Sequence, residues 1–440
     1  MRISGWGRYP VVECATASAR GIVDVQRLLA GHTSLIPRGN GRSYGDASLN
    51  PELTLSMTNM DRFLAFDSES GHLTCEAGAT LADILASFAP RGWFPPVVPG
   101  TKFVTVGGMI AADVHGKNHH AVGSFGSHVE SLCLVTGDGK VLRCSRTEHP
   151  QLFSATLGGM GLTGVIVSAV VRLTPIASQY LDTETLATSD LDATLQTLEE
   201  SHAWPFNVAW VDASARGANL GRALVTRGRW ATKTGRADIP DTLPRSRPVR
   251  LPVDFPSGLL NGLVGRAFNE LYYRLGRSRS GRPQLADYDA FFFPLDGIGE
   301  WNRVYGRKGF LQFQCALPPG TGRQGVAQLL QAIPGSGAHS YLAVLKLFGP
   351  SGEGLISFPI EGTTLALDFP ATRHSVALLG RYDQIATSLG GRVYLAKDAC
   401  TTAARFKEGY PNVNAFSQVR RKAPAKGSVF ESMLSKRLAL

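Results

Sequence analysis

Two glycine-rich loops are the parts of this chain whose residue types and spacing point most directly to chemistry. The first covers Pro37–Asp46 (PRGNGRSYGD) and the second lies within Gly100–Gly126. Glycine reaches positive φ angles and lets a ligand approach the backbone closely, and successive free N–H groups form concavities that bind anions. Two such loops, about sixty residues apart, predict one long ligand that carries a pyrophosphate.

Three other patterns imitate known sites in the wrong setting. Gly41–Gly45 matches the GxSxG of serine hydrolases, but that motif needs a helix directly after it, and Asn50-Pro51 breaks any helix here. Gly159–Gly164 matches GxGxxG, yet the β-branched run after it predicts a strand, not the helix of a dinucleotide fold. The histidines within 115–120 (HGKNHH) lack a carboxylate or thiolate at ligand spacing, so no metal site is expected.

A first domain over residues 1–177 must position the two loops. Apolar spacing predicts helices in ARGIVDVQRLLAGH and TLADILASF, and strands in TSLIPRG, HLTCEAG, GMIAADV and GVIVSAVVRLTP. The Asp-Gly pair at 138–139 predicts a hairpin turn.

The pattern changes in the second domain, 178–391. Segments such as FNVAWVDA, GFLQFQCALP and TTLALDFP alternate apolar and polar residues and are separated by helical stretches. This predicts an antiparallel sheet with helices on one face. Residues 392–440 are expected to return to the first domain and to end in an amphipathic helix, GSVFESMLSKRLAL. The fold class predicted is therefore α+β, with two domains.

Composition is that of a globular protein, with 440 residues of which 43% are hydrophobic and 18% charged. The N-terminus lacks the apolar core of a signal peptide, and no apolar run reaches a membrane-spanning length. Six scattered cysteines without a CxxC pair are typical of reduced thiols, so we expect a cytoplasmic location.

The positive charge is concentrated in one segment. The chain has a formal net charge of +10, and Arg216–Arg282 alone contains fourteen Lys and Arg against four acids. Within it, DIPDTLPRSRPVRLPVDFP and RLGRSRSGR are rich in Pro, Ser and Gly, which predicts mobile loops. The charge is consistent with a solvated loop, or with attraction to an anionic lipid surface at the inner face of the membrane or to a phosphorylated substrate. It lacks the recognition helix or stacking aromatics of a nucleic-acid site, so no nucleic acid is expected.

The motifs PRGNGRSYGD, HGKNHH, GSFG and LGGMGLTGVI resemble the FAD-binding half of the vanillyl-alcohol-oxidase/p-cresol-methylhydroxylase (PCMH) superfamily. Together with SGWGR, GEWNRVYG, KLFGP and YLAKD, they resemble the polyprenylphosphoryl-ribose 2′-oxidase branch of that superfamily nearly end to end. The resemblance implies a PCMH-type FAD-binding domain joined to an antiparallel-sheet substrate domain. It also implies FAD as cofactor, held noncovalently because the first loop has neither His nor Cys for attachment.

The resemblance further implies which residues bind the cofactor, with backbone donors from both loops. They are Pro37, Arg38, Gly39, Asn40, Gly41, Arg42, Ser43, Tyr44, Gly45, Asp46, Gly100, Thr105, Val106, Gly107, Gly108, Ala112, Asp113, His115, Gly164, Val165 and Tyr394.

Catalytic and substrate roles follow from the same resemblance. Lys397 of YLAKD matches the active-site lysine and would stabilise negative charge on the reduced flavin. His115 would take or relay the hydroxyl proton. Lys117 of the same loop would lie near the flavin and the substrate. The expected substrate-binding residues are Lys346, Gln312, Gln314, Trp210, Phe292 and Tyr44.

The implied reaction is oxidation of the 2′-hydroxyl of a polyprenylphosphoryl-β-D-ribose to a ketone, the first half of an epimerisation to the D-arabinose lipid. A separate NAD(P)H-dependent ketoreductase would complete it. Some positions depart from that branch, since Val208, Phe292, Thr364 and Ala366 stand where Ser, Tyr, Asn and Cys are usual. These changes make the sugar pocket less polar, and an aldonolactone or alditol oxidase that uses oxygen remains the alternative.

Overall fold

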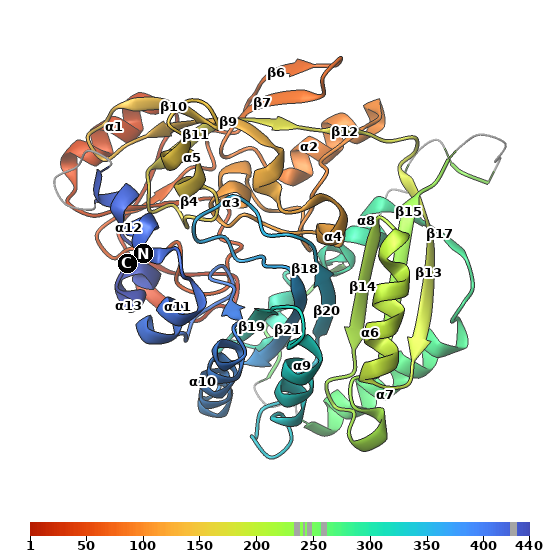
Figure 1. Cartoon of the computed structure of the whole chain (residues 1–440). Coiled ribbons are helices and arrows are strands. Elements are labelled where there is room, and N and C mark those ends of the chain that lie inside the picture. The colour runs from red at the N-terminus through yellow and green to blue at the C-terminus, as the bar shows by residue number, and fades with distance from the viewer. Residues whose placement is uncertain (233–237, 241–242, 244–248, 257–261, 423–428) are drawn as a thin grey trace.

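The structure is a computed structural model that describes residues 1–232, 238–240, 243, 249–256, 262–422 and 429–440. One half of the molecule contains several small sheets, and the other is built on one large sheet (Figure 1). The mixture of helices and mainly antiparallel strands confirms the α+β fold class.

The first half of the chain forms a three-stranded parallel sheet and a five-stranded antiparallel sheet. The parallel sheet has the order β3 (Thr16–Ser18), β5 (Thr54–Ser56) and β4 (Ile36–Arg38). The antiparallel sheet has the order β10 (Val141–Ser145), β9 (Val129–Val135), β11 (Val165–Arg172), β7 (His72–Glu76) and β6 (Phe63–Asp67). The predicted hairpin at 138–139 joins β9 to β10, with Gly139 at φ 79°.

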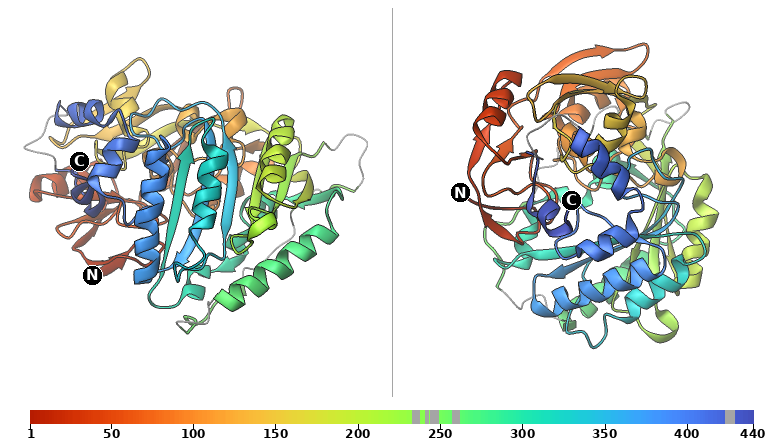
Figure 2. Two further views of the ribbon diagram at one scale, coloured as in Figure 1. Left: turned by 60° about the horizontal axis from the view of Figure 1, so that its bottom comes forward. Right: turned by 60° about the vertical axis from the view of Figure 1, so that its left-hand side comes forward.

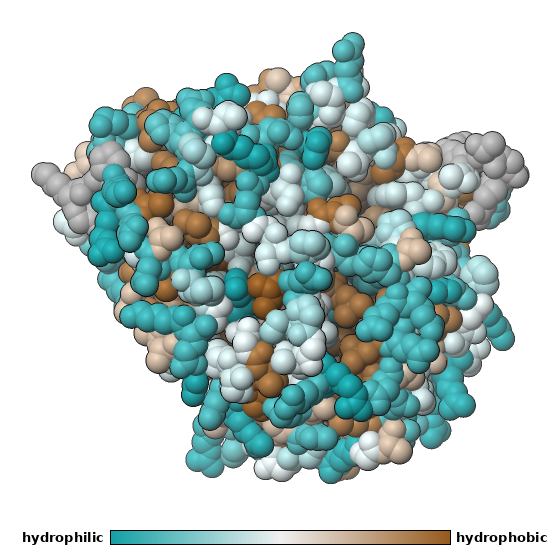
Figure 3. All heavy atoms as spheres, viewed as in Figure 1, coloured by the Kyte–Doolittle hydropathy of each residue, from teal (hydrophilic) through white to brown (hydrophobic). Residues whose placement is uncertain are grey.

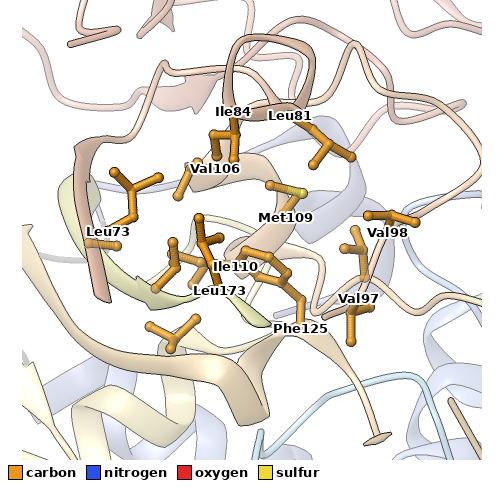
Figure 4. Close-up of a cluster of buried hydrophobic side chains, with 14 of the residues drawn as sticks. Leu73, Leu81, Ile84, Val97, Val98, Val106, Met109, Ile110, Phe125 and Leu173 are labelled. Carbon is orange, nitrogen blue, oxygen red and sulfur yellow. The ribbon is translucent and has the colours of Figure 1, made fainter. Parts of the chain in front are cut away.

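Helices of this half are α1 (Ile22–Gly31), α2 (Leu81–Phe88), α3 (Val106–Ala111), α4 (His119–Val122) and α5 (Pro150–Thr156). Apolar side chains of α2, α3 and the neighbouring strands form one buried core (Figure 4). This core packs directly behind the second glycine loop, because α3 belongs to both.

The strand predicted over GMIAADV is wrong, because α3 occupies most of it. Thr105 caps the helix by accepting a hydrogen bond from Gly108 N at 3.2 Å. Val106, Met109 and Ile110 then fall on one helical face and are completely buried. A short apolar run fits a strand or a buried helix equally well, so the sequence pattern alone could not distinguish the two.

The second half contains the eight-stranded sheet, in which every strand pair is antiparallel as predicted. Its order is β17 (Gln284–Asp287), β13 (Tyr180–Thr188), β15 (Ala223–Trp230), β14 (Phe206–Val211), β20 (Ala343–Phe348), β21 (Gly362–Pro370), β19 (Phe310–Leu317) and β22 (Arg392–Val393). One face is covered by α6 (Leu191–Glu200), α9 (Gly322–Gln331) and α10 (Arg373–Ser388), seen in front of the sheet in Figure 2, left. The other face is turned toward the glycine loops.

The first part of the predicted loop RLGRSRSGR (274–282) is helical instead. Residues 262–278 form α7 (Gly262–Ser278), the long green helix at the edge of the molecule in Figure 2, left. Its large apolar residues recur at helical spacing, a signal that the Arg and Ser content concealed. The other predicted loop, DIPDTLPRSRPVRLPVDFP (238–256), lies partly outside the described residues, at 241–242 and 244–248.

After β22 the chain packs against the first half. Phe406, Phe416 and Leu434 share a buried cluster with Ile36 and Ala155. The helices of this segment are α11 (Ala403–Gly409), α12 (Val413–Lys422) and α13 (Met433–Leu438), the last shorter than predicted. The start of that predicted helix, 427–428, lies outside the described residues.

Candidate active site

A cavity of about 960 Å³ lies between the glycine loops and the inner face of the eight-stranded sheet. This volume is at the upper end of the range found for ligand pockets. Every residue expected to act in catalysis or to bind substrate lines it, namely Lys397, His115, Lys117, Lys346, Gln312, Gln314, Trp210, Phe292 and Tyr44. The fold therefore brings together residues from opposite ends of the chain.

Most of the expected cofactor residues line the same cavity. These are Pro37, Arg38, Gly39, Asn40, Gly41, Arg42, Ser43, Tyr44, Gly100, Thr105, Gly107, Gly108, Ala112, His115, Gly164 and Tyr394. Gly45, Asp46, Val106, Asp113 and Val165 do not line it and lie behind the wall.

Gly45 and Asp46 hold the first loop against the C-terminal segment. A Cβ added to Gly45 would lie 1.9 Å from Asp398 O, so the two backbones touch at this glycine. Arg437 donates to Asp46 Oδ1 and to Asp398 Oδ2, each at 2.8 Å. This buried ion-pair cluster fixes the loop relative to the segment that carries Lys397.

The first loop presents a row of free backbone donors. None of the N–H groups of residues 39–43 donates to an acceptor within the described part of the chain. Gly41 has a φ of 63°, in the left-handed region, and a Cβ on Gly39 would lie 2.1 Å from Thr105 Oγ1. Backbone donors are rarely left unpaired, so a row of them at a cavity fits an anionic group such as the pyrophosphate of FAD.

The second loop contributes differently from what we expected. The N–H groups of residues 106–108 already donate within the protein, for example Gly107 N to Ala77 O at 2.8 Å. Their expected role as free pyrophosphate donors is therefore wrong. Gly107 instead allows close packing, because a Cβ there would lie 3.0 Å from Ala77 Cβ.

His115 is buried at the centre of a hydrogen-bonded chain of side chains. Gln314 Nε2 donates to Thr364 Oγ1 at 3.1 Å and lies 3.0 Å from His115 Nε2. Thr364 Oγ1 donates to Cys315 O at 2.8 Å. On the other side of the ring, His115 Nδ1 lies 3.0 Å from Lys346 Nζ.

The direction of these hydrogen bonds places the protons. His115 Nε2 accepts from Gln314, so the neutral ring carries its proton on Nδ1. That Nδ1–H faces Lys346 Nζ, which can accept it only as an uncharged amine. Burial lowers the pKa of Lys346 to about 7, with the charges of Lys117 and Lys397 acting in the same direction. Burial and Lys346 also hold the pKa of His115 well below its usual range.

A second buried pair lies around Lys397. Its Nζ is 3.7 Å from the centroid of the Tyr44 ring, in a cation–π contact. Burial lowers the pKa of Lys397 to about 7, although the nearby Asp368 carboxylate opposes that shift. Asp368 is completely buried and accepts a hydrogen bond from Gln312 Nε2. Its other oxygen has no partner among the described residues.

Lys117 has a more constrained environment. Its Nζ donates to Phe291 O and, at 3.4 Å, to Phe292 O. Burial lowers its pKa to about 7. These contacts tie the second glycine loop to α8 (Tyr288–Phe292) beneath the cavity. The other two histidines of HGKNHH pack elsewhere, His119 Nδ1 accepting from Gly349 N at 3.2 Å.

Sequence reasoning missed much of the cavity wall opposite the glycine loops. Thr183 and Thr185 of β13 and Thr226 of β15 line the cavity from alternate strand positions. Aromatic residues add to them, namely Phe268, Tyr272, Phe291, Trp301, Tyr305 and Tyr341. The period-2 alternation of the strands could have identified the threonines, but nothing local marks the aromatic residues.

Comparison with known proteins identifies the class of the chain and then its family. Residues 14–145 match the model of an FAD binding domain, and this range contains both glycine loops. The chain is 36% identical to the decaprenylphosphoryl-β-D-ribose oxidase of Mycolicibacterium smegmatis, over 100% of this chain and 97% of that protein. The chain therefore belongs to the decaprenylphosphoryl-β-D-ribose oxidase family of flavoproteins.

Other relatives are more partial or less informative. An uncharacterised protein of Streptomyces coelicolor is 35% identical over 82% of this chain and all of its own length. The L-gulonolactone oxidase of Bos taurus is 30% identical over only 37% of this chain and 36% of its own. No helix of the described residues is long and apolar enough to cross a membrane.

Proposed function

We propose that this protein oxidises the 2′-hydroxyl of a polyprenylphosphoryl-β-D-ribose to the 2′-ketone, with noncovalently bound FAD. The observation that carries the proposal is one cavity that joins the free N–H row of residues 39–43 to three buried lysines. The relative that matches the whole chain is a decaprenylphosphoryl-β-D-ribose oxidase, which supports the substrate class. When bound, FAD would supply the acceptor for the hydride that leaves the carbinol carbon.

The protein's own task is to accept the proton that the hydroxyl loses as the C=O bond forms. Lys346 Nζ is suited to this, because its contact with His115 Nδ1 requires a neutral amine. Gln314 and Thr364 hold His115 in the tautomer that carries its proton on Nδ1, which faces a neutral Lys346. After accepting the proton, the Lys346 ammonium would keep its hydrogen bond to Gly116 O, to which Nζ donates at 3.2 Å.

Lys397 has a separate role. As a cation it would stabilise negative charge that develops on the reduced ring system, and Asp368 favours its charged form. Lys117 would position α8 and add to the positive potential of the cavity, which suits a phosphate-bearing substrate.

The 2′-ketone is an intermediate in the proposed reaction. Its reduction from the opposite face would invert the configuration, and a separate NAD(P)H-dependent ketoreductase would supply that hydride. Equal amounts of purified protein and such a reductase should convert the ribose lipid to the arabinose lipid, and neither should do so alone.

Anaerobic flavin bleaching tests the central proposal. The holoprotein should lose its absorbance near 450 nm with a polyprenylphosphoryl ribose and keep it with free aldonolactones or alditols. Bleaching by lactones alone would favour the alternative, an aldonolactone or alditol oxidase, which the partial similarity to L-gulonolactone oxidase represents.

The mode of FAD attachment has its own test. Residues 37–46 of the first loop contain no His or Cys, so acid precipitation should release all of the flavin into the supernatant. Flavin that remains in the protein pellet would show a covalent bond.

A further inference from the structure

Large exposed apolar side chains gather at one part of this molecule. Of sixteen such residues in the described part of the chain, nine lie within residues 249–298. The face seen in Figure 3 is mostly hydrophilic with scattered apolar groups, as is usual for a protein surface. A dense group of exposed apolar residues is unusual and marks a contact site.

Helix α7 reverses the ordinary pattern of a surface helix. It turns small or polar side chains toward the body, where Gly265, Asn269 and Tyr273 are buried. Its large apolar side chains point outward, with exposed fractions of 50% for Phe268, 58% for Leu271, 45% for Tyr272 and 53% for Leu275. A helix that packed only against its own protein would bury its large apolar side chains and expose its small and polar ones.

These outward residues continue into the cavity. Phe268 and Tyr272 line it, and so does Ile298, which is 41% exposed. The Tyr272 ring lies 4.6 Å from the ring of Trp210 on the inner face of the sheet. We call Phe268, Leu271, Tyr272, Leu275 and Ile298 the apolar rim. Phe268, Tyr272 and Ile298 therefore connect the outer face of the protein to the cavity through apolar and aromatic side chains.

Charge indicates what lies against the rim. The segment Arg216–Arg282 carries the whole net positive charge of the protein, and Arg266, Arg277 and Arg279 are exposed on α7 or just after it. Apolar and basic residues on one surface helix are the signature of binding at an anionic lipid interface.

We propose that the apolar rim inserts into an anionic membrane surface, so that a prenyl lipid passes from the bilayer into the cavity past Phe268 and Tyr272. The identity of that lipid rests on the proposed function, but the docking itself does not. Peripheral attachment through α7 would let a protein take a substrate that water does not dissolve.

Vesicle sedimentation of the holoprotein tests the docking. Leu271 and Leu275 do not line the cavity, so the pair L271E/L275E should weaken binding to phosphatidylglycerol vesicles by about a hundred-fold. The control, V23E/L64E, changes two apolar residues on the other half of the protein that are 76% and 51% exposed, against 58% and 53% for Leu271 and Leu275. It should bind like wild type, and phosphatidylcholine vesicles or high salt should weaken binding of both.

Flavin reduction separates docking from catalysis. L271E/L275E should bleach normally with a short, soluble prenylphosphoryl ribose and slowly with the long-chain lipid in vesicles. Equal vesicle binding by wild type and L271E/L275E would overturn the proposal. So would a dimer of wild type that L271E/L275E converts to a monomer without any loss of vesicle binding, because a second copy would then cover the rim. Docking without bleaching by any prenylphosphoryl ribose would contradict the proposed function and leave the docking surface intact.

Discussion

The two walls of the cavity are built in different ways. The wall proposed to hold the cofactor, residues 37–44 and 100–117, offers free backbone N–H groups at residues 39–43 and, in both loops, close approaches that only glycine permits. We call it the cofactor wall. The substrate wall, the inner face of β14, β19, β20 and β21, offers side chains at alternate strand positions. Strand register places four of them in one row, namely Trp210, Val344, Ala366 and Gln314. Damage to the first wall should therefore remove the cofactor, and damage to the second should change turnover while the cofactor stays bound.

The largest effect is expected from G45A. The added Cβ would lie 1.9 Å from the backbone oxygen of Asp398, so the first loop or the segment carrying Lys397 must move. We expect FAD binding to weaken by at least about a hundred-fold, measured as the flavin content of the purified protein and by titration of the apoprotein.

A glycine of the cofactor wall provides the control. Unlike Gly45, Gly100 lines the cavity itself, and a Cβ there meets nothing within 4 Å, so G100A should bind FAD like wild type. If G45A fails to fold, G39A tests the same idea through the contact with Thr105. Normal flavin content in both G45A and G39A would show that these close approaches do not maintain the cofactor wall.

This contrast also explains what the sequence could reveal. The loops of the cofactor wall could be located from the sequence because their glycines are consecutive or nearly so, and this motif is visible without knowledge of the fold. The residues of the substrate wall were inferred only from the resemblance to a known family. Trp210, Gln314 and Ala366 become neighbours only through the register of four strands, which the sequence does not show. No local pattern carries that information.

Two sequence predictions failed for related physical reasons. The run that forms α3 is short and apolar, so burial against the core, not periodicity, decided between helix and strand. The Arg, Ser and Gly content of RLGRSRSGR predicts a loop, but residues 274–278 form the end of α7, whose large apolar residues face outward. In both, tertiary or external contacts override the local signal.

The next largest effect is expected from the loss of the Lys397 charge, beside the substrate wall. K397M should retain FAD but slow the reductive half-reaction by about 10²- to 10³-fold, the effect of removing one preorganised electrostatic group. Stopped-flow absorbance under anaerobic conditions measures this rate. K407M, an exposed lysine in α11, is the control and should react at the wild-type rate. A normal rate for K397M would exclude a role for this charge in the reaction.

The pH dependence should be about tenfold in K397M. Lys346 accepts a proton only when neutral, and its pKa lies at about 7 because of burial and the charges of Lys117 and Lys397. Rising pH removes the proton from Lys346 but also the charge from Lys397, whose pKa is likewise about 7. The reductive rate of wild type should therefore pass through a maximum near pH 7, whereas in K397M it should rise about tenfold from pH 6 to pH 8 and then level off. K346M should lose the rise below pH 7 together with most of its activity. T364V, which removes the partner that orients Gln314, should keep the rise but shift its midpoint. A pH rise that persists unchanged in K346M would assign the proton to another group.

The smallest effect should come from V208S. Val208 lines the cavity on β14 beside Ala209 and Trp210, and a hydroxyl there would face the sugar without touching the cofactor wall. One new hydrogen bond to the substrate should lower KM by about fivefold and leave kcat and FAD affinity unchanged, because the bond forms equally in the ground and transition states. V376S, a change at an exposed site on α10, should leave both constants at their wild-type values. If V208S instead loses flavin, the two walls are not independent, and the separation that their construction suggests is wrong.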